Sequence, residues 1–276
     1  RTSQIVKEKG AIVVRHRKNK GVGAAFKSGV KKVLSMDIDL MVNIDADGQF
    51  NPQDISKLLD PIINGEADFV TASRFIDKNL YPTMSAVKFH GNKFMSWFIS
   101  KIIGERFYDV SCGFRAYSKE TLQRLNLFGQ FTYTQETFID LAFKEMTIQE
   151  VPIKVRGKRE VGKSRVASNI LKYGYQTLSI IVKTMRDYKP LQLFGFISTI
   201  VFLLGCGFGV FLLQYYFVYD SFSPHKWAGF VAGFLIILSF ALLMLGFILD
   251  MFSRMRDNQE KIIFMLNRNS SNNKTK

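Results

Sequence analysis

The sequence predicts an α/β domain followed by two membrane-spanning helices, and three observations support this fold class. Short apolar runs of strand length alternate with longer stretches of helical period along residues 1–165. Residues 191–219 and 227–249 contain no charged side chain, and each run exceeds the about 20 residues that an apolar helix needs to cross a bilayer. Two buried core helices are the alternative, but both runs are apolar on every side, which favours spans at 191–219 and 227–251.

The α/β domain is expected to alternate strands with helices. Strands are expected at residues 11–15, 40–45, 67–72 and 148–155, and helices at residues 21–34, 87–103 and 135–144. Asn51 is expected to cap a further short helix, because Pro52 follows it at a first helical position. This alternation indicates a layered fold with a mainly parallel sheet.

The charges that flank the two apolar runs predict their orientation. Lysines and arginines are frequent before the first run and after the second, whereas the loop 220–226 offers only Lys226 as a strong base. By the positive-inside rule both ends are expected in the cytoplasm, including a tail at 252–276. Residues 166–190 mix apolar and basic side chains, which is typical of an amphipathic juxtamembrane helix, although an ordinary surface helix of the domain shows the same pattern.

The composition narrows the class of partner. The formal net charge is +15, which suits anionic lipid, an anionic substrate or nucleic acid. Two expected membrane spans make nucleic acid the weakest of the three. The two cysteines are Cys112 and Cys206, and because Cys206 lies inside an expected span we expect a reducing cytosol and no disulfide framework.

A pair of carboxylates gives the sharpest chemical signal. Asp45 and Asp47 follow an apolar run, and Gly48 breaks the strand. Carboxylates two residues apart at a strand end can point to one side and share a hard divalent cation, and ligands of open α/β sheets gather beyond such ends. An ordinary Asp-Gly turn explains these residues equally well when they are taken alone.

The carboxylate pair is one member of an ordered series of motifs. The others are Asn19-Lys20-Gly21-Val22-Gly23-Ala24-Ala25, Ala72-Ser73-Arg74-Phe75, Asp109-Val110-Ser111-Cys112-Gly113-Phe114-Arg115-Ala116-Tyr117, Gln135-Glu136, and Arg159 with Gly162-Lys163-Ser164. In this order the series resembles the family 2 glycosyltransferases, and within them the dolichol-phosphate mannose synthases and the bacterial polyprenyl-phosphate glycosyltransferases. The resemblance covers nearly the whole chain, including the two C-terminal spans.

The resemblance implies a GT-A (Rossmann-like) fold and a set of site residues. Asp45, Asp47 and Gln49 would hold Mg²⁺ or Mn²⁺, and Asp45 would also contact the nucleotide diphosphate. The resemblance implies catalytic roles for Asp109, which would lie near the reacting sugar, and for Arg74, which would contact the phosphates or the acceptor. A structural ion pair is the alternative for Arg74. The other substrate-binding residues that the resemblance implies are Arg159, Lys163, Ser164, Gln135 and Glu136, of which Glu136 could instead brace its helix.

The resemblance also implies the reaction and its place. It implies an inverting transfer of a hexose-type sugar from a nucleotide diphosphate sugar to a polyprenyl phosphate. The enzyme would be integral to the cell membrane of a prokaryote, with its catalytic domain in the cytoplasm and in contact with membrane lipids. Assembly into a homo-oligomer is left open, and nucleic acid is not expected as a partner.

One departure from the family pattern concerns the beginning of the chain. Family members start with an apolar strand and a segment like Asp-Asp-Gly-Ser that holds the base and ribose. Here Arg1-Thr2-Ser3-Gln4-Ile5-Val6 resembles the stretch just after that segment. The domain at residues 1–165 is therefore expected to be N-terminally truncated and to lack its first strand.

A competing motif lies at residues 157–164, where the sequence GKREVGKS satisfies the P-loop pattern between an expected strand and an expected helix. Residues 41–45 could serve as the acidic strand that assists Mg²⁺ in such proteins, but that strand normally comes later in the chain. Too little chain separates Ser164 from the first apolar run to complete a sheet. A membrane-associated P-loop nucleotide triphosphatase is therefore an alternative, and an inactive membrane scaffold with an idle carboxylate pair is another.

Overall fold

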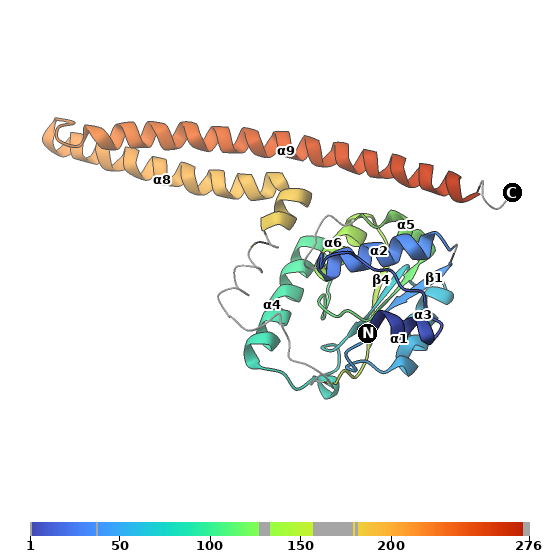
Figure 1. Ribbon diagram of the computed structural model, residues 1–276. Helices are drawn as coiled ribbons and strands as arrows, with labels where there is room; N and C mark the ends of the chain where they lie inside the picture. Colours follow the sequence, from blue (N-terminus) through green and yellow to red (C-terminus); the bar gives the residue numbers. More distant parts are fainter. Residues whose placement is uncertain (1, 37, 127–132, 157–178, 180–181, 273–276) are drawn as a thin grey trace. The chain divides into compact units, whose positions relative to one another are not determined.

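The structure is a computed structural model that describes residues 2–36, 38–126, 133–156, 179 and 182–272. Two compact units make up the chain. The first contains Arg1–Tyr173 and Ile263–Lys276, and the second contains Gly174–Ile262. The expected alternation of strands and helices is confirmed in the first unit (Figure 1).

The first unit is built on a four-stranded sheet with the order β1-β3-β2-β4. The strands are β1 (Leu40–Asn43), β2 (Phe69–Ser73), β3 (Arg115–Ser118) and β4 (Ile148–Pro152). Strand β3 is antiparallel to both β1 and β2, whereas β2 and β4 are parallel. The expectation of a mainly parallel sheet is therefore wrong for the described residues: β1, β2 and β4 share one direction, but β3 runs the other way between two of them.

Helices cover both faces of this sheet (Figure 1). Helix α3 (Ile55–Ile63) covers one face, where Leu58 packs with Val70, Phe114, Ala116 and Ile153 in a buried cluster. The other face is covered by α2 (Val22–Leu34) and α6 (Tyr133–Phe143), through the contacts Phe26–Tyr117 and Phe138–Phe69. The remaining helical segments of this unit are α1 (Thr2–Glu8), η1 (Pro52–Asp54), η2 (Lys78–Leu80), α4 (Ala86–Ile103) and α5 (Lys119–Arg124).

Most of the expected elements are present. The Asn51 side chain accepts a hydrogen bond from the Gln53 amide and caps η1, with Pro52 at the first turn, as the sequence predicts. Residues 11–15, in contrast, are not a strand. An apolar run forms a strand only beside a hydrogen-bonded neighbour, and no described strand pairs with this segment. Strand β3 and helices α1 and α5 were not expected from the sequence.

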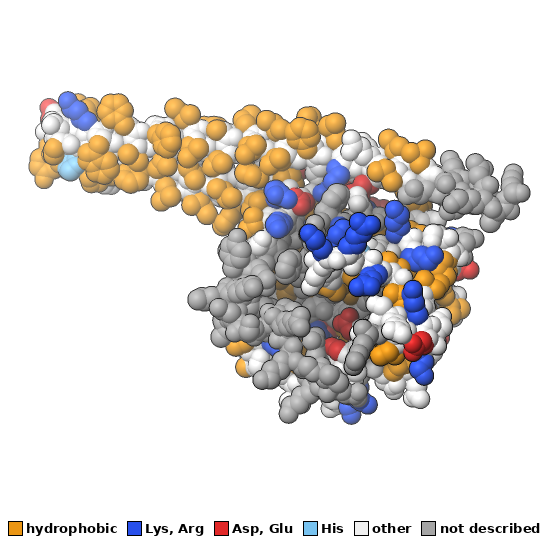
Figure 2. All heavy atoms as spheres, in the orientation of Figure 1, with side chains coloured by type: hydrophobic (Ala, Val, Ile, Leu, Met, Phe, Trp, Pro, Cys, Tyr) orange, Lys and Arg blue, Asp and Glu red, His pale blue; other side chains and the backbone are white. Residues whose placement is uncertain are grey.

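The second unit consists mainly of two long apolar helices. Helix α8 (Pro190–Tyr219) and helix α9 (Lys226–Asn272) are both long and apolar enough to be candidate membrane spans. Hydrophobic side chains cover their visible faces (Figure 2). Gly205 allows close packing between them, because a Cβ there would lie 3.1 Å from Leu235 and Ile236 side-chain atoms. The Ser198 hydroxyl also donates to the Ser239 carbonyl at 2.8 Å.

The expected domain boundaries in this region stay predictions. Most of the juxtamembrane helix expected at residues 166–190 lies outside the described residues, although residues 182–188 are helical. Helix α9 continues to Asn272, well past the expected end of the second span at residue 251. The segment expected as a tail at 252–276 is therefore helical over its described part.

Candidate active site at the sheet edge

One edge of the sheet gathers most of the residues that the sequence singles out. Because β1, β2 and β4 run one way and β3 runs the other, the ends of those three strands and the start of β3 meet at the same edge. Arg115, the first residue of β3, is opposite Asn43 near the end of β1 and opposite Thr71 of β2. Segments that leave such strand ends form the ligand sites of many open α/β sheets.

The carboxylate pair lies just beyond β1. Asp45 is exposed, and the Asp47 carboxylate accepts a hydrogen bond from the Gln49 amide at 3.2 Å across a turn at Gly48, whose φ is 73°. A Cβ added to Gly113 would lie 3.0 Å from Asp45 Oδ2. The glycine before β3 therefore leaves room for the Asp45 carboxylate beside the neighbouring strand.

Asn43, at the end of β1, connects three segments close to the carboxylate pair. Its amide nitrogen donates to the Gly113 carbonyl at 2.7 Å and to the Tyr133 hydroxyl at 2.9 Å. The Tyr133 ring stacks on Phe26 with the ring centres 4.3 Å apart. Burial raises the pKa of Tyr133, and the nearby negative charge of Asp45 also raises it. The phenol therefore stays neutral at physiological pH, next to the carboxylate pair.

Gln49 connects the carboxylate segment to the chain that follows β4. Its side-chain nitrogen donates to the Arg156 carbonyl at 2.9 Å, and the Arg156 amide donates to the Gln49 carbonyl at 3.0 Å. These contacts fix the turn that carries Asp47. The expected role of Gln49 as a metal ligand stays a prediction.

The residues present at this edge fit a magnesium or manganese ion that is shared with a substrate. Among the described residues no group of three or more His, Cys, Asp or Glu side chains could hold a metal alone. Asp45 and Asp47 supply two carboxylates, and Mg²⁺ commonly takes one or two carboxylates together with substrate phosphates and water. The site therefore suits a metal ion that binds together with a diphosphate, and it is less suited to a metal ion held by protein ligands alone.

Arg74 and Asp109 form an ion pair at the end of β2. The Arg74 side chain donates from Nε at 2.5 Å and from Nη2 at 2.8 Å to the two oxygens of Asp109. The Arg74 amide donates to the same carboxylate at 3.1 Å, and Arg74 Nη2 also donates to the Ser111 hydroxyl at 2.9 Å. Asp109 is 0% exposed, whereas the Arg74 side chain is 17% exposed. The ion pair that the sequence left as an alternative for Arg74 is therefore present, and the catalytic roles of both residues stay predictions.

Two residues that the sequence reasoning missed hold this region in place. Glu150 of β4 accepts hydrogen bonds from the amides of Tyr108 and Asp109, both at 2.7 Å. Arg115 is 0% exposed, and its guanidinium donates to the carbonyls of Val110, Cys112 and Thr134. A charged residue between the apolar residues Phe114 and Ala116 is the signal that could have identified Arg115, because a buried cation needs partners.

The remaining expected site residues are placed less completely. Gln135 and Glu136 lie in the first turn of α6, which begins at Tyr133, and the Thr134 hydroxyl donates to the Gln135 side-chain oxygen at 2.7 Å. Arg159, Lys163 and Ser164 lie outside the described residues, as does the P-loop pattern at 157–164.

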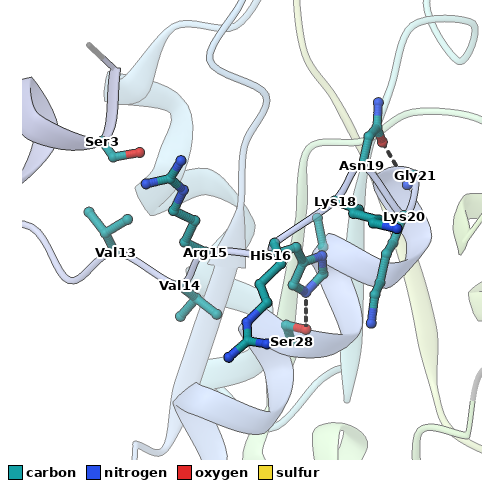
Figure 3. Close-up of a pocket in the computed structure, with 12 residues that line it drawn as sticks. Ser3, Val13, Val14, Arg15, His16, Lys18, Asn19, Lys20, Gly21 and Ser28 are labelled. Carbon is teal, nitrogen blue, oxygen red and sulfur yellow. Dashed lines mark hydrogen bonds between the residues drawn. The ribbon is translucent and has the colours of Figure 1, made fainter.

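A basic pocket lies in the segment that leads into α2. It has a volume of about 380 Å³ and is lined by Arg15, Arg17, Lys18 and Lys20, together with Gly21, which precedes the helix (Figure 3). His16 and the Ser28 hydroxyl form a hydrogen bond of 2.7 Å beside it. The charge of this lining suits an anionic ligand.

Comparison with known proteins gives a consistent result. The model of the family described as glycosyl transferase family 2 matches residues 1–125. An uncharacterized protein of Methanocaldococcus jannaschii is 36% identical over 158 residues, which cover 56% of this chain and 65% of that protein. A UDP-N-acetylglucosamine–dolichyl-phosphate N-acetylglucosaminyltransferase of Methanococcus voltae is 35% identical over 52% of this chain and 58% of its own length.

A third relative is the polyprenol monophosphomannose synthase of Mycolicibacterium smegmatis. It is 30% identical over 165 residues, which cover 58% of this chain and 62% of that protein. The aligned region thus spans about three fifths of the length of each of these relatives.

Proposed function

Because residues 1–125 match the glycosyl transferase family 2 model, we propose that the chain transfers a hexose-type sugar from a nucleotide diphosphate sugar to a polyprenyl phosphate. Two relatives are named for products or substrates of this kind, a dolichyl phosphate and a polyprenol monophosphomannose. The observation that carries the proposal is the edge of the sheet, where the ends of β1 and β2 and the start of β3 bring Asp45, Arg74 and Asp109 into one region. This reaction needs carboxylates that bind a metal ion and a cationic side chain that binds phosphate oxygens.

The proposed reaction is an inverting displacement. An oxygen of the acceptor phosphate forms a bond to the anomeric carbon, and the bond from that carbon to the diphosphate oxygen breaks. The acceptor is already an anion at neutral pH, so no strong general base is required. The protein has to align two anions that repel each other and to neutralise the diphosphate that leaves.

The chain's own residues divide these tasks. Asp45 and Asp47 would hold Mg²⁺ or Mn²⁺, which neutralises the leaving diphosphate when it is bound. Arg74 presents a guanidinium at the same edge for phosphate oxygens of the donor or the acceptor. Asp109 acts through Arg74 and not as a base, because its carboxylate is buried and accepts two hydrogen bonds from that guanidinium.

Further substrate contacts are proposed on the family resemblance. Gln135 and Glu136 begin α6 beside Tyr133 and would contact the donor sugar or the acceptor. Arg159, Lys163 and Ser164 would bind the pyrophosphate or the lipid phosphate. The link between Gln49 and Arg156 supports this proposal, because it joins the carboxylate segment to the chain that leads to those residues.

Helix α4 supports contact of the domain with lipid. Its sequence contains three lysines and no aspartate or glutamate. Phe94 is 47% exposed and Trp97 is 56% exposed, and His90 and Lys101 lie on the same helical face by their spacing. Exposed aromatic side chains flanked by bases fit the headgroup layer of an anionic membrane. The proposed occupant of this face is therefore membrane lipid, which also contains the acceptor.

The proposed location is the cytoplasmic face of the cell membrane of a prokaryote. The candidate spans α8 and α9 would anchor the chain, and the basic residues at both ends would keep those ends inside. The alternatives, a P-loop nucleotide triphosphatase and an inactive scaffold, gain no support from the described residues.

A donor screen tests the proposal directly. Membranes from cells that produce the full-length protein are incubated with polyprenyl phosphate, Mg²⁺ and each of several radiolabelled UDP and GDP sugars. We expect one donor to label a glycolipid that is extracted into organic solvent, and EDTA to abolish the labelling. Absence of labelled lipid with every donor, in membranes that contain folded protein, would refute the proposed function.

A further inference from the structure

We infer that Glu150 is a positioning residue for Arg74, and that it acts through Asp109. This inference rests on the proposed function for its kinetic test but on the structure alone for its geometry. Glu150 Oε2 accepts a hydrogen bond from the Tyr108 amide, and Oε1 accepts one from the Asp109 amide, both at 2.7 Å. Each carboxylate oxygen thus binds one of two consecutive backbone N–H groups, which fixes the backbone at Asp109.

Asp109 carries the effect from its backbone to Arg74. Its side chain accepts three hydrogen bonds from Arg74, at 2.5, 2.8 and 3.1 Å, and its Oδ1 also accepts one from the Ser111 hydroxyl at 3.1 Å. Because Asp109 has no exposed surface, water does not replace these contacts. The orientation of the Arg74 guanidinium is therefore set by the position of residue 109.

The segment that contains Asp109 needs such a clamp because it has no regular structure. Residues 104–114 connect the end of α4 to β3 without a helix or strand. Glu150, in contrast, lies in the edge strand β4 and is paired with Thr71 of the neighbouring strand β2. The carboxylate therefore fixes the irregular connection to the sheet at Asp109, a residue of the candidate site.

The clamp requires a carboxylate and not merely a polar side chain. Glutamine has the same shape, but one of its two terminal atoms is an NH₂ donor, which would face a backbone N–H. Glu150→Gln therefore leaves one of the two amides without an acceptor, and an unsatisfied donor away from water destabilises the backbone position that the clamp fixes. Burial raises the pKa of Glu150, and the hydrogen bonds from these two amides act in the opposite direction and lower it.

The kinetic test compares Glu150→Gln, Arg74→Lys and the double variant in the full-length chain. Glu145→Gln is the matched control, because Glu145 is an exposed glutamate just before β4. We expect Glu150→Gln to lower kcat by about tenfold with a smaller change in KM, since the cation remains but is misaligned. Lysine cannot form the two-pronged pair, so the double variant should lose no more than Arg74→Lys alone. A kcat equal to that of the control, or losses that multiply in the double variant, would overturn the inference.

Two further measurements keep the test decisive. Asp109→Asn retains the clamp but removes the charge that orients Arg74, so it should lower kcat and be non-additive with Arg74→Lys even if Glu150→Gln fails to fold. Amide hydrogen exchange over residues 104–113 needs no turnover. It should be faster in Glu150→Gln than in wild type or in Glu145→Gln, and unchanged exchange would overturn the clamp. Faster exchange in a chain that transfers no sugar would refute the proposed function and leave the clamp standing.

Discussion

Gly113→Ala is expected to impair the proposed metal site while the fold stays intact. The added Cβ would lie 3.0 Å from Asp45 Oδ2, 3.5 Å from Asp45 Cγ and 3.6 Å from the Tyr133 hydroxyl. The first distance is too short, so the Asp45 carboxylate has to move by a few tenths of an ångström. Asp45 is exposed and can move, so the substitution should shift a ligand without breaking the sheet.

The size of the effect follows from this displacement. A misplacement of about 1 Å in a reacting geometry costs about 100-fold in rate, so a few tenths of an ångström should cost about three- to tenfold. The assay measures initial rates of glycolipid formation against Mn²⁺ concentration at saturating donor. We expect the variant to need more Mn²⁺ for half-maximal rate and to have a lower kcat.

The matched control is Gly29→Ala. Gly29 lies in helix α2, and a Cβ there would meet no atom within 4 Å. Alanine in a helix interior is favoured over glycine by about 0.5–1 kcal/mol, so this variant should be at least as stable as wild type and fully active. If Gly113→Ala and Gly29→Ala show the same Mn²⁺ dependence and kcat, Asp45 does not bind the metal and the reasoning fails.

Four other substitutions test the proposed metal site, the P-loop alternative, the surface of α4 and the orientation in the membrane. Asp47→Ala should abolish transfer without a large change in thermal stability, and undiminished turnover at saturating Mg²⁺ would remove Asp47 from the metal site. Lys163→Ala should weaken glycolipid formation while wild type hydrolyses no ATP or GTP; nucleotide hydrolysis that this variant abolishes would favour the P-loop alternative. Replacing Phe94 and Trp97 by serine should weaken transfer to long-chain lipid in vesicles more than transfer to a short soluble prenyl phosphate, and equal losses would remove α4 from the membrane surface. A cysteine at Ser223 should react with an impermeant thiol reagent in intact cells, and labelling only after permeabilisation would reverse the proposed orientation.

The sequence predicts those elements whose side-chain pattern is long and regular. Helix α2 has a long apolar stripe and the short helix capped by Asn51 has a clear start signal, and both helices are present. Strand β3 has four residues, one of them a buried arginine, so no period-two pattern identifies it. At residues 11–15 the error is the opposite: a strand is expected but absent. An apolar run does not reveal whether a neighbouring strand is available for pairing.

For the candidate site, the sequence identifies residues better than their partners. Asp45, Asp47, Arg74 and Asp109 all stand in the motif series, and the structure places them on segments that meet at one sheet edge. The direct pairing of Arg74 with Asp109 spans 35 residues, and no local pattern encodes it. Glu150 was missed for a similar reason. In a half-buried strand a glutamate is usually solvent-exposed, and the sequence does not show that its amide partners lie more than 40 residues away.

The strand order has a consequence for how the chain folds as it is synthesised. Strands β1 and β2 come first in the sequence but do not pair with each other, because β3 lies between them. Until residues 115–118 have left the ribosome, both strands expose unpaired edges, and the contacts that complete the sheet are distant in sequence. A nascent chain at that stage has an incomplete sheet that can bind other strands. This protein should therefore depend on chaperones more than a protein whose neighbouring strands are synthesised one after the other.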